Sequence, residues 1–221
     1  MAVHVLGNSA KMSELMRIVK KYNLTLIEDT CESLGSKFGS KFLGSFGRFG
    51  TFSFYVSHQI SAGEGGMIVC NDYNDYKIIH SLRSHGWDRG LNNNKKNSFN
   101  FINSGFNLRP MDITAAIGLN QFKRLNKMIQ IRSSNRKKII NSIKSSQNWN
   151  HQIEFLISSE KVKPSWFGLP ILINKKYLNK KKKYLSYLNK NGVETRPIIS
   201  GNFLNQPASK LYKLNAKKET F

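Results

Sequence analysis

Short apolar runs alternate with periodically spaced apolar positions at the start of the chain. Ala2–Leu6 predicts a short buried strand, and Leu24–Glu28 predicts a second one. Between them, Asn8 and Ser9 offer an N-cap to a helix. The apolar positions of this helix are Met12, Leu15, Met16 and Val19. Strand, helix and strand within about thirty residues form a βαβ unit, so we expect a parallel sheet with both faces covered.

Loops punctuated by glycine and two further strands follow. Glycines at positions 35, 39, 44, 47 and 50 mark a loop-rich passage that ends in a strand at Thr51–Tyr55. Gly66–Asn71 predicts another strand. The segment Asp88–Asn103 is polar and rich in asparagine, which predicts a mobile loop.

The rest of the chain is mainly helical before it becomes mixed. Apolar residues between Met111 and Lys144 keep roughly helical periodicity, which predicts a long helix with a break near Ser133 and Ser134. The elements predicted after it are a strand at Ser165–Ile173, a helix at Lys175–Asn189 and a turn at Gly192–Pro197 that leads into another strand.

These elements divide the chain into two parts of an α/β protein. We expect the parallel sheet in residues 1–145 and a smaller α+β part in residues 146–221. One βαβ unit needs more partner strands than the sequence obviously supplies, so we also expect the chain to be truncated at both ends.

Charge and cysteine content narrow the class of protein. Lys and Arg number 35 against 13 Asp and Glu, a net charge of +22 that on its own suggests nucleic acid, an anionic membrane or a phosphorylated ligand. The lysines are scattered among many asparagines, which favours solvated faces and a coding bias instead. Two cysteines, Cys31 and Cys70, indicate a reducing compartment. No apolar run is long enough to cross a bilayer, so we expect a cytoplasmic protein without membrane insertion. Because the charge is scattered, we expect no nucleic-acid partner.

Several residues have the chemistry and the position of ligand-binding groups. Asp29 ends a predicted parallel strand, where it could cap a helix or pair with a cationic ligand atom, and Glu32 could line the same pocket. Ser53 precedes His58 by five residues, and the glycine-rich turn that follows suits either a phosphate or a tight reversal. A hydrogen-bonded structural histidine is the simpler interpretation of His58 alone. The histidines show no metal-ligand spacing, so no metal is expected.

A second polar group precedes the long helix. Asn107 and Arg109 lie two residues apart in a loop that opens with glycine, and either could reach a phosphate or cap the helix. The residues alone do not choose between these roles.

Five motifs in order resemble the pyridoxal-phosphate-dependent nucleotide-sugar aminotransferases, the DegT/DnrJ/EryC1/StrS family. The motifs are IEDTCESLGSKF, GSFGRFGTFSFYVSHQISAGEGGMIVCND, LRSHGWDRG, SGFNLRPMDITAAIGLNQ and VETRPIISGNFLNQP. The resemblance implies a fold type I aminotransferase architecture with a mixed, mostly parallel sheet. Residues 1–145 would be the C-terminal part of the large cofactor-binding domain, and residues 146–221 part of the small α+β domain. It also implies a homodimer with active sites at the subunit interface.

The resemblance also implies roles for individual residues. Asp29 matches the aspartate that pairs with the pyridine nitrogen, Glu32 a residue near the ring 3-hydroxyl, and Ser53 a serine that binds the cofactor phosphate. Asn107 matches an asparagine that reaches the phosphate in the neighbouring subunit. The candidate substrate-binding residues are Arg109, Arg196 and Asn202.

His58 stands where aminotransferases of the family have the lysine that binds the cofactor covalently. An imidazole cannot form that bond, but it can transfer protons. The same replacement marks a subgroup resembling 3-dehydratases, which use pyridoxamine phosphate to remove the C3 hydroxyl of a 4-keto-6-deoxy nucleotide sugar. The implied product is a 3,6-dideoxy sugar for surface polysaccharide, that is, lipopolysaccharide or O-antigen.

The same resemblance implies how the cofactor is regenerated. L-glutamate would be the amino donor, because an iron–sulfur cluster of the usual kind needs four cysteines and the chain has two. The alternatives are a 4-aminotransferase of the same family and a catalytically inactive fragment.

Overall fold

The structure, a computed structural model, describes residues 1–91 and 99–212. The described chain forms two compact units. The first contains Met1–Trp149 and Ile157–Leu169, and the second contains Asn150–Leu156 and the described residues from Pro170 onward. The predicted assignment of residues 1–145 and 146–221 to a large and a small domain stays a prediction.

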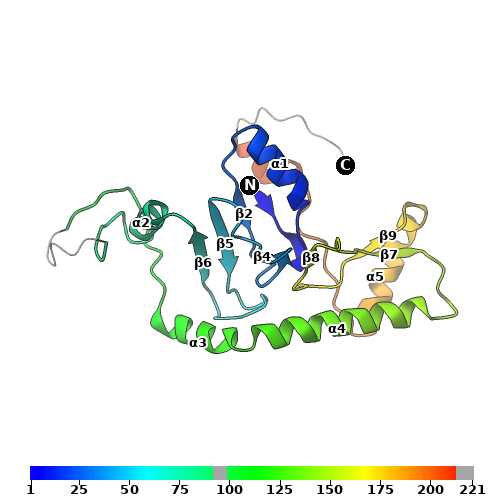
Figure 1. The fold of residues 1–221 in the computed structure, drawn as a ribbon. Coiled ribbons are helices and arrows are strands. Elements are labelled where there is room, and N and C mark those ends of the chain that lie inside the picture. The colour runs from blue at the N-terminus through cyan, green and yellow to red at the C-terminus, as the bar shows by residue number, and fades with distance from the viewer. Residues whose placement is uncertain (92–98, 213–221) are drawn as a thin grey trace. The chain divides into compact units, whose positions relative to one another are not determined.

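The main sheet of the first unit has four strands in the order β1-β2-β5-β6 (Figure 1). Their bounds are Ala2–Val3 for β1, Ile27–Asp29 for β2, Phe49–Ser53 for β5 and Gly66–Cys70 for β6. The pairs β1–β2 and β2–β5 are parallel, and β5–β6 is antiparallel. The predicted mixed, mostly parallel sheet is therefore confirmed.

The connection after β1 differs from the prediction. The strand ends at Val3, and Val5–Gly7 form a 3-10 turn in which Leu6 has a φ of 56°. Helix α1 spans Met12–Lys21 and follows Lys11, which makes no side-chain cap. The predicted N-cap at Asn8 and Ser9 is wrong, because the Ser9 hydroxyl donates to the carbonyl of Ala10 instead.

Short strands and helices complete the first unit. A second sheet has the order β4-β3-β8, with β3 at Lys37–Phe38, β4 at Lys41–Phe42 and β8 at Val162–Lys163. Helix α2 spans Tyr73–Leu82, α3 spans Asp112–Phe122 and α4 spans Leu125–Lys144.

The long predicted helix breaks at a different place from the one predicted. The interruption falls between α3 and α4, at Lys123 and Arg124, and α4 runs unbroken through Ser133 and Ser134. Leu125 begins α4 and is 6% exposed, because it packs in the core. Burial of this side chain, which local sequence does not reveal, therefore sets where the second helix starts.

An apolar cluster of the first unit includes a residue close to His58 in the sequence. Its buried side chains are Leu34, Ile60 and Leu125, with Phe52, Phe54 and Ile129 packed against them. Ile60 is 3% exposed and comes two residues after His58. The core therefore fixes the chain on the far side of the turn that holds this histidine.

The described residues of the second unit form one short sheet and one helix of regular length. Strand β7, Ile153–Phe155, pairs antiparallel with β9, Ile171–Ile173. The 3-10 segment η2, Lys175–Lys180, leads directly into helix α5, Lys181–Lys190, so the predicted helix is confirmed. Two further 3-10 segments follow, η3 at Phe203–Asn205 and η4 at Pro207–Leu211.

Two strand predictions in this part of the sequence fail in whole or in part. Of Ser165–Ile173 only Ile171–Ile173 is a strand. Ser165 to Leu169 belong to the first unit. No strand follows Pro197 in the described residues, where Ile199 has a φ of 49° that extended backbone does not adopt. Within residues 1–91 and 99–212, no helix combines the length and the apolar character needed to cross a bilayer.

Candidate functional site

The carboxyl ends of two adjacent parallel strands hold the first two candidate residues. Asp29 ends β2, and its backbone pairs in register with Thr51 of β5. Ser53 ends β5 and lies on the same face of that strand as Thr51, because side chains alternate along a strand. The Asp29 carboxylate accepts the N–H of Cys31 at 3.1 Å, and the Ser53 hydroxyl accepts the N–H of Tyr55 at 3.2 Å. The sheet therefore presents a carboxylate and a hydroxyl at neighbouring strand ends; the position of Asp29 was expected from the sequence, whereas β5 ends at Ser53, two residues before the predicted end.

A cysteine thiol lies beside this carboxylate. Burial raises the pKa of the Cys31 thiol to about 11, and the Asp29 carboxylate adds to the effect. The thiol is therefore protonated at neutral pH and reacts slowly with electrophiles.

Glu32 joins two distant parts of the site. Its side-chain Oε2 accepts the N–H of Leu6 at 2.6 Å. Its backbone carbonyl accepts a hydrogen bond from the side-chain amide of Gln59. Glu32 therefore connects the turn after β1 with the residue that follows His58.

His58 is half-buried and is held by its backbone and by ring contacts. Its N–H donates to the carbonyl of Tyr55 at 3.0 Å. The imidazole lies 5.2 Å from the ring of Phe167 and 6.0 Å from that of Tyr55, centroid to centroid. Nδ1 is buried and has no hydrogen-bond partner in the described residues. This nitrogen is therefore a buried polar atom that no described residue satisfies.

Gln59 and Ser165 are two buried residues that sequence reasoning missed. Gln59 is 1% exposed and donates through Nε2 to the Ser165 hydroxyl at 3.2 Å. Ser165 is fully buried and is also bonded to Ser36 at 2.9 Å. A buried polar side chain directly after His58 is the signal that could have identified Gln59, but its partners lie far away in the sequence.

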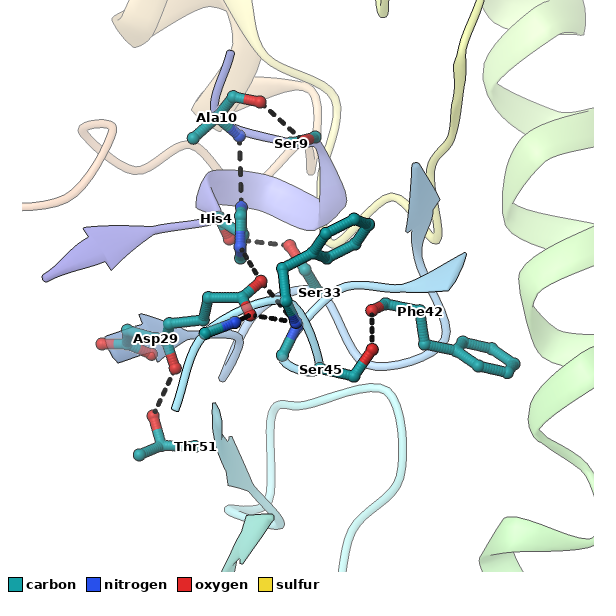
Figure 2. A network of polar contacts seen from close by, with 12 residues as sticks. His4, Ser9, Ala10, Asp29, Ser33, Phe42, Ser45 and Thr51 are labelled. Atoms are coloured by element: carbon teal, nitrogen blue, oxygen red, sulfur yellow. Dashed lines mark hydrogen bonds and ion pairs between the residues drawn. The ribbon is translucent and has the colours of Figure 1, made fainter. Parts of the chain in front are cut away.

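A buried hydrogen bond between His4 and Glu28 supports β2 just before Asp29 (Figure 2). His4 Nε2 lies 3.0 Å from Glu28 Oε2, and both side chains are fully buried. His4 Nδ1 accepts the N–H of Ala10 at 3.2 Å, so the ring donates through Nε2.

Backbone amides complete the environment of this carboxylate. Glu28 accepts the N–H groups of Gly44, Phe46 and Gly47 at 2.9, 2.6 and 2.7 Å. Burial alone would raise the Glu28 pKa, but the hydrogen bonds from His4, Gly47 and Gly44 outweigh it and hold the pKa below 4.5. This pair therefore ties β1, β2 and the 44–47 loop together beneath the site.

The remaining candidate residues lie in other places. Asn107 forms an isolated bridge with Ser84, and its side chain accepts Arg109 Nε at 3.2 Å. Both side chains are exposed, and neither is hydrogen-bonded to the Asp29 or His58 side chains in the described chain.

Two candidates belong to the second unit. Arg196 Nε donates to Glu194 at 2.8 Å, and Asn202 caps η3 by accepting the N–H of Leu204 at 3.0 Å. The structure places Asp29 and Ser53 at neighbouring strand ends and links Glu32 to the residue after His58, and the predicted roles of all eight candidate residues stay predictions. Among the described residues, no group of three acidic, histidine or cysteine side chains is placed to hold a metal ion.

Comparison with known proteins gives concordant matches. The model of the DegT/DnrJ/EryC1/StrS aminotransferase family matches residues 1–220. GDP-4-keto-6-deoxy-D-mannose 3-dehydratase of Escherichia coli O55:H7 is 35% identical over 215 residues, which cover 92% of this chain and 54% of that protein. Lipopolysaccharide biosynthesis protein RfbH of Salmonella typhimurium is 32% identical over 94% of this chain and 51% of its own length.

A solved structure is also similar. It is a GDP-4-keto-6-deoxymannose-3-dehydratase with a trapped PLP-glutamate geminal diamine, with a TM-score of 0.85 and 34% identity. The match covers 96% of this chain and 57% of that structure. The chain thus spans about half the length of the relatives it matches.

Proposed function

We propose that this chain, which belongs to the DegT/DnrJ/EryC1/StrS aminotransferase family, acts in the C3 dehydration of a GDP-linked 4-keto-6-deoxy sugar. The carrying observation is His58, an imidazole five residues after the end of β5 whose buried Nδ1 has no hydrogen-bond partner among the described residues. The dehydratase with 35% identity supports the same reaction class. The cofactor we propose is pyridoxal phosphate in its pyridoxamine form.

The residues present fit this cofactor. The Asp29 carboxylate accepts one backbone N–H and has a second oxygen for a protonated ring nitrogen. The Ser53 hydroxyl accepts one N–H and retains its own proton to donate to a phosphate oxygen. The neutral Cys31 thiol adds no competing charge. Asp29 and Ser53 would thus hold opposite ends of the cofactor, with Glu32 near the ring hydroxyl.

The pyridoxamine form supplies the amine that links to the sugar at C4 and a cationic ring that withdraws electrons. The Asp29 carboxylate would hold the ring nitrogen in its protonated form and so preserve this electron demand. His58 would be the base for the proton released in this chemistry, and the imidazolium so formed would be the acid that gives that proton to the departing C3 hydroxyl, which leaves as water. The half-buried setting of His58 limits competing solvent around this proton transfer.

We propose L-glutamate as the amino donor that restores the pyridoxamine form. The similar structure with a trapped PLP-glutamate adduct supports this choice. A [2Fe–2S] centre is not part of the proposal, because Cys31 and Cys70 are two ligands where four are needed.

We propose a cytoplasmic homodimer that contributes to lipopolysaccharide O-antigen. The similarity to RfbH supports the pathway. Helix α3 supports self-association, because Ile113, Leu119 and Phe122 are 65%, 68% and 58% exposed. Asn107 would reach the cofactor phosphate of the second subunit, and Arg109, Arg196 and Asn202 would contact the substrate.

The decisive assay combines the protein with pyridoxamine phosphate, L-glutamate and GDP-4-keto-6-deoxymannose. Mass spectrometry and NMR of the sugar should show loss of the C3 oxygen, together with release of ammonia. The His58→Asn variant, which retains a polar side chain without a base, should not form this product. A 4-amino sugar that keeps its C3 hydroxyl would identify an aminotransferase and overturn the proposal.

A further inference from the structure

One turn contacts both His58 and the residue after it. We call Ser165, Trp166 and Phe167 the 165–167 turn. The Phe167 ring lies 5.2 Å from the His58 ring at an angle of 47°. The Ser165 hydroxyl accepts the Gln59 side-chain amide at 3.2 Å. The turn therefore contacts two consecutive side chains that precede it by more than one hundred positions.

Helix α4 holds the turn from one side. Arg132 Nη1 donates to the carbonyl of Trp166 at 3.1 Å and to that of Phe167 at 3.0 Å. Arg136 stacks over the Trp166 ring, with its guanidinium carbon 3.9 Å from the ring centroid. Two arginines one helical turn apart thus fix the turn's backbone and its central side chain.

The segment after β1 holds the turn from another side. Phe167 N–H donates to the carbonyl of Leu6 at 2.9 Å, and Ser165 N–H donates to that of Gly7 at 3.1 Å. A Cβ on Gly7 would lie 2.4 Å from the Trp166 nitrogen, so only glycine allows this backbone approach.

The contact involves strained backbone. Trp166 has a φ of 43° and Leu6 a φ of 56°, values that residues other than glycine seldom adopt. Such conformations persist where the surrounding structure fixes them, and they cluster at functional sites. Trp166 is only 7% exposed, and the hydrogen bonds above restrain both residues.

His58 depends on this packing because hydrogen bonds do not orient its ring in the described part of the chain. Nδ1 has no partner there, and the ring contacts are those with Phe167 and Tyr55. Tyr55 is 43% exposed, so it restrains the ring from a wetter side. A ring held by packing keeps the orientation that its packing partners impose.

We propose that Phe167 is a positioning residue that fixes the His58 imidazole for proton transfer, and that Arg132 holds Phe167 in place. The inference rests on the proposed function only for the claim that His58 transfers a proton. The orientation of the ring is a property of the protein itself.

The test compares two disruptive variants with two matched ones. Phe167→Leu removes the aromatic face, whereas Phe167→Tyr keeps it. Arg132→Met removes the hydrogen bonds to the turn, whereas Lys137→Met makes the same kind of change at an exposed position of α4. One readout is the NMR signals of the His58 ring, assigned by their loss in His58→Asn. The other is kcat and KM for dehydration.

Phe167→Leu and Arg132→Met should shift the His58 ring signals and lower kcat about tenfold to hundredfold with little change in KM, as expected for a misplaced catalytic group. Phe167→Tyr and Lys137→Met should resemble the wild type in both readouts. Unshifted His58 signals in folded Phe167→Leu and Arg132→Met would overturn the proposal. If Phe167→Leu does not fold, Arg132→Met decides.

The two readouts separate this inference from the proposed function. Shifted ring signals in a protein whose wild type does not dehydrate the sugar would support the positioning role and refute the function. Dehydration by the wild type with unshifted signals in the disruptive variants would support the proposed function and refute the positioning role.

Discussion

Replacing Glu28 with glutamine should destabilise the first unit strongly. The carboxylate accepts four hydrogen bonds, two at Oε1 from Phe46 and Gly47 and two at Oε2 from His4 and Gly44. An amide keeps one oxygen, so its NH₂ group would face two donors. Each lost hydrogen bond to a charged group costs about 1.5–3 kcal/mol, which predicts a total loss of about 3–6 kcal/mol. Such a loss is a large part of the stability of an ordinary domain.

Urea unfolding monitored by circular dichroism measures this loss at pH 7. The matched control is Glu64→Gln, a change of the same atoms at an exposed position of the glycine-rich turn, which should alter the free energy of unfolding by less than about 0.5 kcal/mol. A loss below about 1 kcal/mol in Glu28→Gln would refute the assignment of Glu28 as a fully engaged buried acceptor.

The pH dependence of the unfolding free energy is an independent test of the role of Glu28. The Glu28 pKa in the folded protein lies below 4.5, so its stabilising contribution is complete above that value and is lost as pH falls through the folded pKa. Glu28→Gln has no such titration. The difference in unfolding free energy between wild type and variant should therefore narrow as pH falls below 4.5, and a widening difference would contradict this explanation.

Three further predictions concern the surroundings of the site. Gly7→Ala should cost about 1–3 kcal/mol more unfolding free energy than Gly63→Ala, because both have a positive φ but only the first meets backbone; equal losses in urea unfolding would contradict the close approach. Cys31, with a pKa of about 11, should react with iodoacetamide at pH 8 far more slowly than free cysteine, as peptide mass spectrometry would show; an equal rate would refute its burial. Hydrogen bonds from Arg48 hold the pKa of Asp75 below 3.8, so Arg48→Gln should be less stable than wild type at pH 7 and should approach it as pH falls below 3.8; a difference that persists in acid would argue against the pair.

One strand end of the site could be predicted from local sequence. The apolar run before Asp29 identifies a strand with its carboxyl end at this residue, whereas β5 begins and ends two residues before the predicted strand at Thr51–Tyr55. Charged Glu28 gave no such signal, because its partners are His4, 24 residues earlier, and the amides of a later loop. Its burial is a property of the folded chain.

The 165–167 turn could not be predicted for the same reason. Its apolar residues suggest an extended strand, yet its backbone bonds to Leu6 and Gly7 near the start of the chain. The positive φ of Trp166 is set by these contacts and by Arg132, not by local preference. The helix start at Leu125 likewise depends on core packing.

The central claim is that His58 occupies the position of the cofactor-binding lysine and transfers protons without a covalent bond to the cofactor. Wild type and His58→Lys would each be incubated with pyridoxal phosphate, reduced with borohydride and weighed intact, followed by peptide mapping. The account predicts a cofactor adduct at residue 58 in the variant and no adduct in the wild type. Trapping of the wild-type chain at another lysine, or cofactor binding by His58→Lys without an adduct at residue 58, would contradict it.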